Sequence, residues 1–112
     1  MTIYISLPIT GYDLTERKEL AEKARETLRS KYPKARITTP FDLSEDVEVE
    51  APNPGYADYM KVDLGFIIGK ADTVCFLVNP RFTKSKGVKL EWHAARIYHK
   101  KIKRMRNYEH QD

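Results

Sequence analysis

The spacing of apolar residues changes several times along the chain, and each change predicts the start of a new strand or helix. Short β-rich or apolar runs bounded by turn residues predict strands at residues 2–7, 36–39, 73–79 and 102–105. The run at residues 73–79 is apolar without a break, which is typical of a parallel strand buried on both faces. Apolar residues at helical spacing predict helices over Leu14–Lys31, Tyr56–Gly69 and residues 85–99.

Two element boundaries carry a recognisable local signal. Asp13 is suited to cap the N-terminus of the first helix, and Glu16, three residues later, would complete a capping box. Pro40 is expected to end the second strand. The polar, acidic stretch at residues 42–55 contains Pro52 and Pro54, so we expect it to be a surface loop.

Strands that alternate with helices predict an α/β fold with a single domain over residues 1–112. We expect a small, doubly wound parallel sheet of four to five strands with helices on both faces, a three-layer sandwich of the flavodoxin-like or Rossmann-like kind. Ligands of such folds bind outside the carboxyl ends of the strands. The segments expected at that edge are residues 7–13, 40–42 and 79–87.

Composition agrees with an ordinary globular domain and excludes several classes of protein. The chain has 112 residues, of which 41% are hydrophobic and 32% charged, so it is long enough for one domain with a real core but too short for two domains. No apolar run approaches the roughly 18 residues that a membrane span needs, and we expect no signal peptide and a cytoplasmic location. The single cysteine, Cys75, excludes an intrachain disulfide and is expected to be a small core residue.

The formal charge of +4 comes largely from the C-terminal part of the sequence. A run of basic residues there is most simply interpreted as a solvated helix end or a charged edge strand. Nucleic-acid binding is the alternative, although no aromatic residues alternate with the basic ones. The basic residues concerned are Lys100, Lys101, Lys103, Arg104 and Arg106.

Two carboxylates occupy positions where a helix should be apolar. The neighbours of Glu91 on its helix face are the small or apolar residues Gly87, Val88, Ala94 and Ala95. Those of Asp63 are Tyr59, Met60, Phe66 and Ile67. Because an ionised carboxylate costs several kcal/mol to desolvate without a partner, each is either a buried structural carboxylate, paired for example with an arginine, or a catalytic group.

The start of the third helix is a candidate anion site, because free N–H groups and the helix dipole favour negative charge there. Ser85 and Gly87 lie at this position, and Ser85 is explained equally well as an ordinary N-cap. Asp42, at the carboxyl end of the second strand, is a candidate sugar contact or a loop-starting Asp. His93 and His99 do not share a helix face, so we expect no metal and no cofactor.

Three motifs occur in order at suitable spacing and resemble those of the nucleoside 2-deoxyribosyltransferase-like superfamily. They are the strand and loop YISLPITG at residues 4–11, Tyr59-Met60-(x2)-Asp63, and Ser85-x-Gly87-(x3)-Glu91. The chain is most similar to a small bacterial and phage branch of that superfamily, DUF4406-like, over roughly residues 2–99. The family loop usually begins Gly-Pro, and Leu7 stands here in place of the glycine.

The resemblance implies cleavage or transfer at the N-glycosidic bond of a nucleoside or nucleoside 5′-monophosphate. By this resemblance Glu91 is the nucleophile, Asp63 handles the proton of the departing base or orients the sugar, and Tyr4 holds Glu91 by a hydrogen bond. Ser85 and Gly87 would receive a 5′-phosphate. The sugar pocket would be lined by Leu7, Pro8, Ile9 and Gly11, and Phe82 would offer a stacking surface for a base.

Other functions remain open beside this one. A side chain at position 7 favours the alternative of a nucleotide-binding module of the same fold without turnover. A nucleic-acid-associated protein that uses the basic C-terminal run is a third possibility. The resemblance also implies a homo-oligomer, and nothing in the sequence indicates a membrane partner.

Overall fold

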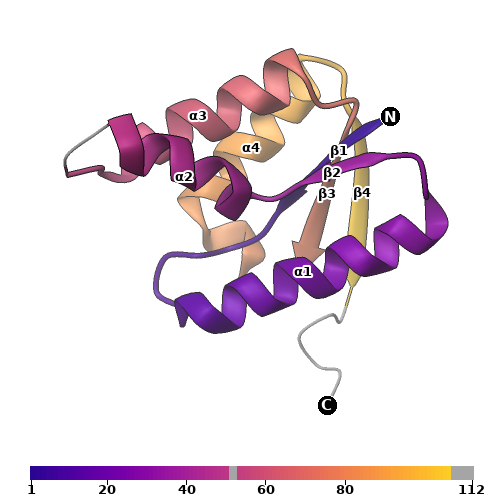
Figure 1. Ribbon diagram of the computed structural model, residues 1–112, viewed down its shortest axis with the longest axis horizontal. Coiled ribbons are helices and arrows are strands. Elements are labelled where there is room, and N and C mark those ends of the chain that lie inside the picture. The colour runs from indigo at the N-terminus through magenta and orange to yellow at the C-terminus, as the bar shows by residue number, and fades with distance from the viewer. Residues whose placement is uncertain (51–52, 107–112) are drawn as a thin grey trace.

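The computed structural model describes residues 1–50 and 53–106, and in these residues four parallel strands form one sheet with helices on both faces (Figure 1). The strands are β1 (Thr2–Ser6), β2 (Arg36–Thr38), β3 (Thr73–Val78) and β4 (Lys101–Arg106), in the order β2-β1-β3-β4. The helices are α1 (Leu14–Lys31), α2 (Pro40–Glu50), α3 (Tyr56–Gly69) and α4 (Lys86–Ile97), with a short 3-10 turn, η1 (Phe82–Lys84). The predicted three-layer α/β class is confirmed.

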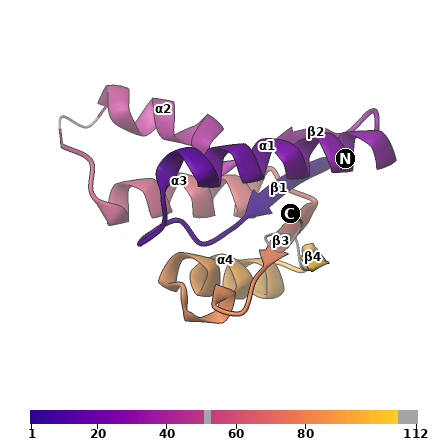
Figure 2. The ribbon, with the colours of Figure 1, turned by 90° about the horizontal axis from the view of Figure 1, so that it is seen from below.

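Strand β1 lies inside the sheet, and its alternate residues belong to two different cores. Ile3 and Ile5 pack with α1 on one face, whereas Tyr4 packs with α3 and α4 on the other. Figures 1 and 2 show this arrangement, with α1 on one side of the strands and α3 and α4 on the other. The alternation follows from the two-residue period of a strand, and it decides which side chains of β1 can reach Glu91 on α4.

Helices α3 and α4 each begin with a local cap. Ser85 is the N-cap of α4, and its hydroxyl accepts a hydrogen bond from the Val88 N–H at 3.3 Å. At the start of α3 the Asp58 carboxylate accepts a hydrogen bond from the Gly55 N–H at 2.8 Å. The predicted N-cap Asp13 is confirmed for α1, since its carboxylate accepts from the Glu16 N–H at 3.1 Å.

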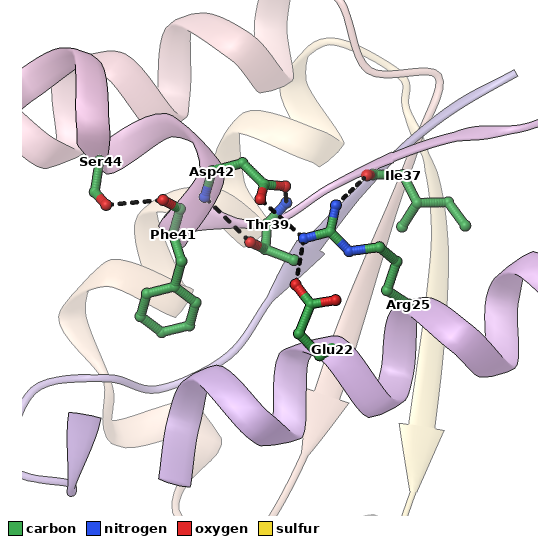
Figure 3. A network of polar contacts seen from close by, with 7 residues as sticks. All are labelled: Glu22, Arg25, Ile37, Thr39, Phe41, Asp42 and Ser44. Atoms are coloured by element: carbon green, nitrogen blue, oxygen red, sulfur yellow. Dashed lines mark hydrogen bonds and ion pairs between the residues drawn. The ribbon is translucent and has the colours of Figure 1, made fainter. Parts of the chain in front are cut away.

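The surface loop predicted at residues 42–55 is wrong for its first part, because residues 40–50 form the helix α2. Thr39 and Asp42 exchange hydrogen bonds at the start of this helix, the Thr39 N–H donating to Asp42 Oδ2 at 2.9 Å and the Asp42 N–H to Thr39 Oγ1 at 3.3 Å (Figure 3). Pro40 occupies the first helical position, where its missing N–H costs nothing. Residues 51–52 of the predicted loop lie outside the described residues.

The Asp42 carboxylate also fastens α2 to α1. Arg25 donates to Asp42 Oδ1 at 2.9 Å, to Glu22 at 2.7 Å and to the Ile37 carbonyl at 3.1 Å (Figure 3). Burial alone would raise the pKa of Asp42, but the hydrogen bonds from Arg25 and Thr39 and the arginine's charge outweigh it and lower this pKa. These contacts fix the position from which α2 runs toward α3.

Strand β4 is the edge strand that the sequence predicts, and its cations lie against aromatic rings on both faces. The Lys103 ammonium is 5.0 Å from the centre of the Tyr32 ring, and the Arg104 guanidinium is 4.8 Å from that of Trp92. Both distances are within cation–π range. Among the described residues no helix is long and apolar enough to cross a membrane.

Candidate active site

Glu91 is buried in the α4 surface that faces the sheet, with 4% of its surface exposed. Both of its carboxylate oxygens accept a hydrogen bond from β1. The Tyr4 hydroxyl donates to Oε2 at 2.6 Å, and the Ser6 hydroxyl donates to Oε1 at 2.7 Å. Such short bonds to a carboxylate are of the charge-assisted kind, so β1 fixes this side chain at both oxygens.

Asp63 approaches the same group from α3. It is 8% exposed, and its charge acts on both Tyr4 and Glu91. Burial, followed by the charges of Glu91 and Asp63, raises the pKa of the Tyr4 hydroxyl well above its ordinary value. Tyr4 therefore keeps its proton and remains a hydrogen-bond donor between two carboxyl groups.

Burial changes the protonation of the two carboxyl groups. It raises the pKa of Asp63 to about 7. Burial and the nearby charge of Asp63 raise the pKa of Glu91 to about 8, against the opposing effect of the hydrogen bonds from Tyr4 and Ser6. Near neutral pH the two groups titrate as one coupled pair, so the site can hold one carboxylate and one carboxylic acid side by side.

The structural interpretation of the two carboxylates, an ion pair with arginine, finds no support in the described residues. The ion pairs there join Arg17 to Glu16 and Arg25 to Glu22 and Asp42, and none reaches Asp63 or Glu91. The groups that act on Glu91 are two hydroxyls and one carboxyl group. Nor do three or more His, Cys, Asp or Glu side chains gather in the described part of the chain as a metal site requires.

The first turns of α3 and α4 meet at Gly87, one helical turn before Glu91. A methyl group added to Gly87 would lie 3.4 Å from Met60 Sδ, 3.8 Å from the Tyr56 hydroxyl and 3.9 Å from Ser85 Oγ. These are ordinary van der Waals distances, so the first turn of α4 packs closely beside Met60 and Tyr56 of α3. Tyr56 is 47% exposed, yet burial of its hydroxyl and then the charge of Glu91 raise its pKa. Tyr56 is therefore a surface residue whose hydroxyl lies near enough to Glu91 to be affected by its charge.

In the segment after β1, two apolar side chains pack on the α1 side of the sheet, and the predicted lining of a sugar pocket by this segment stays a prediction. The Leu7 side chain is 3% exposed and belongs to the core on the α1 side, with Ile9 packed against the same cluster. Pro8 is buried, and Gly11 has φ 88°, a left-handed conformation that favours glycine. Because the Leu7 side chain packs on the face opposite Glu91, a ligand at Glu91 would meet this segment through its backbone rather than through that side chain.

Of the remaining predicted site residues, three lie on the side of the sheet that carries Glu91, and the fourth, Asp42, is bonded elsewhere. Phe82 is half-buried in η1 and packs against the core on the α3 and α4 side, the side on which Glu91 lies. Ser85 and Gly87 lie at the start of the helix that carries Glu91. The polar contacts of Asp42 go to Arg25 and Thr39, so its role as a sugar contact stays a prediction.

The sequence analysis missed Ser6 and Tyr56. A signal for Ser6 was present, because it follows Tyr4 by two residues in a strand and must therefore face the same side of the sheet. Once Tyr4 was a candidate partner of Glu91, Ser6 was one too. Tyr56 carried a weaker signal, since it lies at the first position of α3, seven residues and about two helical turns before Asp63.

Comparison with known proteins gives one match. The family model described as a domain of unknown function (DUF4406) matches residues 1–104, so the chain belongs to this family. No curated protein and no solved structure matches the chain. The matched region contains the whole of the Tyr4, Ser6, Asp63 and Glu91 site, while the chemistry of the site has to be inferred from its geometry.

Proposed function

We propose that the protein is an N-glycosidase or deoxyribosyltransferase that acts on nucleosides or nucleoside 5′-monophosphates, as a member of the nucleoside 2-deoxyribosyltransferase-like superfamily. The observation that supports this most is the setting of Glu91. Its carboxylate is held at both oxygens by hydroxyls, lies beside a second carboxyl group, and has no ion-pair partner among the described residues. This is the arrangement that a carboxylate nucleophile and its acid partner require.

The proposed reaction has two steps. In the first, an oxygen of ionised Glu91 attacks the anomeric carbon, the N-glycosidic bond breaks, and its electron pair goes to the base nitrogen. Asp63 supplies the proton that the departing base takes up. In the second, water or the nitrogen of another base attacks the same carbon and releases Glu91, while Asp63 takes back a proton. Water gives hydrolysis, and a second base gives transfer.

One shared proton suits this sequence of steps, provided that it rests on Asp63. Burial raises the pKa of both carboxyl groups, so one of them can keep a proton near neutral pH. The hydrogen bonds from Tyr4 and Ser6 favour the ionised form of Glu91. They therefore support the reactive form, in which Glu91 is ionised and Asp63 is protonated.

The N-terminal end of α4 is the proposed place for the 5′-phosphate. Its N-cap Ser85 and the bare backbone at Gly87 lie one to two turns from Glu91, a separation on the scale of a nucleotide's phosphate and anomeric carbon. The helix dipole favours an anion at this end. The exposed Lys84 and Lys86 flank Ser85 and add positive charge, and Phe82 offers a ring to a base.

A base-release assay tests the proposal. Wild-type protein and Glu91→Gln are incubated with ribo- and deoxyribonucleosides and their 5′-monophosphates, with and without a second free base, and the products are separated by chromatography. We expect base release or exchange by the wild type and a loss of at least about 1,000-fold in the variant. Glu19→Gln, the same change at an exposed position of α1, is the matched control and should behave as wild type.

The alternatives give different results in the same samples. A nucleotide-binding module would show a rise in melting temperature with monophosphates and no release of base by the wild type. A nucleic-acid-associated protein would bind DNA or RNA with an affinity that falls steeply with salt. We also expect a homo-oligomer, which sedimentation of the wild type would measure.

A further inference from the structure

Ser6 is the last residue of β1 and has no exposed surface. Its hydroxyl donates a hydrogen bond to Glu91. It faces the α3 and α4 side because it follows Tyr4 by two residues. It also lies at the carboxyl end of the strand, the end at which ligands of parallel sheets bind. A serine buried at this place could have bonded to the backbone, as most buried hydroxyls do, but its bond goes to a carboxylate instead.

Two hydroxyl donors do what one cannot. A hydrogen bond to one oxygen leaves a carboxylate free to swivel about that contact, because the last torsion of a glutamate side chain is broad. Tyr4 at Oε2 and Ser6 at Oε1 together determine both the position and the plane of the Glu91 carboxylate. Each bond also favours the ionised form over the protonated one.

We propose that Ser6 is a positioning residue for the Glu91 nucleophile: it holds Oε1 in one orientation and favours the ionised carboxylate, while Tyr4 anchors Oε2. This inference rests on the proposed function, because a nucleophile needs to be positioned only if Glu91 reacts. Ser6 itself exchanges no bond with the substrate. When Glu91 is protonated, the Ser6 hydroxyl can instead accept a hydrogen bond from the Glu91 carboxyl group. The contact can therefore form in both protonation states of Glu91.

Ser6 can be tested cleanly because it carries no charge. The titratable groups that face Glu91 are Tyr4 from β1 and Asp63 and Tyr56 from α3. Ser6→Ala leaves all three in place and removes one hydrogen bond. Since that bond lowers the pKa of Glu91, its loss raises this pKa further and makes the ionised form rarer at a given pH.

The first experiment measures steady-state base release by Ser6→Ala across pH. We expect kcat to fall about 10- to 100-fold, as for one charge-assisted hydrogen bond, while KM stays within about twofold. The acid limb of the pH profile should move to higher pH. Ser6→Thr restores the hydroxyl and should recover most of kcat, and Ser6→Cys, a weaker donor of similar volume, replaces it if the threonine variant does not fold.

Thr73→Val is the matched control. Thr73 is a fully buried strand hydroxyl that lies on β3 beside Ile3, a residue of the opposite core. Removing its hydroxyl should leave kcat, KM and the acid limb unchanged. A loss of kcat in Ser6→Ala without a shifted acid limb, or an equal loss in Thr73→Val, would overturn the assignment and make Ser6 an ordinary packing residue.

A second measurement separates this inference from the proposed function. The titration of the Glu91 side-chain carboxyl is followed by ¹³C NMR in wild type and Ser6→Ala, which needs no substrate. A higher Glu91 pKa in the variant supports the coupling even if the wild type releases no base, and in that case it is the glycosidase proposal that fails. An unchanged titration overturns the role of Ser6 whatever the activity.

Discussion

The two faces of β1 serve opposite purposes although they belong to the same five residues. On the α1 side Ile3 and Ile5 pack in an apolar core and carry no polar group. On the α3 and α4 side Tyr4 and Ser6 each direct a hydroxyl to Glu91. One face is built to exclude water and the other to hold a buried charge. A strand makes this possible because successive side chains point in opposite directions.

The comparison shows how a small domain can accommodate an unstable group. A buried carboxyl pair costs stability, because burial opposes its ionisation. The apolar face offers the compensation, since each large side chain buried there stabilises the fold by about 1.5–3 kcal/mol. The expectation is that changes on one face affect chemistry and changes on the other affect stability, and three predictions test that division.

The largest effect is expected on the polar face, from Asp63→Asn. If Asp63 protonates the departing base, its loss should lower kcat for ordinary nucleosides by about 10² to 10⁴-fold. In 7-methylguanosine the base is already cationic, so it can leave without taking up a proton. With this substrate the loss of kcat in Asp63→Asn should be far smaller. Base release from both substrates measures this. An equal loss with both would show that Asp63 orients the sugar and does not act as the acid.

The next effect is expected on the apolar face, from Leu7→Ala. Because Leu7 is 3% exposed in the α1-side core, its truncation should lower the free energy of unfolding by about 2–5 kcal/mol. Activity of the folded fraction should not change, although residue 7 adjoins Ser6. Urea unfolding and base release measure the two quantities, with Leu14→Ala at a half-exposed position as control. A higher kcat in Leu7→Ala would show that this side chain restricts the substrate after all.

The smallest effect is expected from pH, which should change the stability of the fold through the two buried carboxyl groups of the polar face. The folded protein keeps protons on Glu91 and Asp63 up to about pH 8 and 7, whereas the unfolded chain releases them near 4.5 and 3.8. The stability that this gives is full below the lower values and is lost as pH rises through the higher ones. Between pH 5 and 8 we therefore expect the free energy of unfolding to decrease as the pH rises.

Glu91→Gln should flatten that decrease, because the amide has no charge to bury. Urea unfolding of both proteins at several pH values measures it, and Glu19→Gln should keep the wild-type slope. A wild-type stability that rises from pH 5 to 8 would mean that the carboxyl pair is stabilised in its ionised form.

Much of the fold could be predicted because the strong signals were local. Helices α1 and α3 have the predicted bounds, and the unbroken apolar run of β3 correctly indicated a parallel strand. The anomaly of Glu91 and Asp63 was visible for a similar reason, since the apolar neighbours that reveal a buried carboxylate lie three and four residues away on the same helix. Both carboxylates are indeed buried.

The failures arose where a local pattern was ambiguous or a partner was remote. Residues 42–50 are polar and acidic, which resembles a loop, and the helix signals were the Thr39-Pro40-x-Asp42 start and one apolar pair at helical spacing, Leu43 and Val47. Pro40 was interpreted as the end of a strand when it also begins α2. The bond from Ser6 to Glu91 joins residues 85 positions apart, and only the register of strands and helices brings them together.

The basic edge of the sheet has a consequence for how copies of the protein meet one another. An open strand edge is a template on which a second sheet can grow. Two copies that approached through β4 would bring its lysines and arginines to within a strand spacing of about 5 Å. Two of these cations, Lys103 and Arg104, already lie over aromatic rings of their own copy. At low ionic strength, repulsion between the basic residues of two β4 strands therefore opposes edge-to-edge pairing. Salt screens it, so concentrated salt is the condition under which edge-to-edge aggregation becomes a risk during purification.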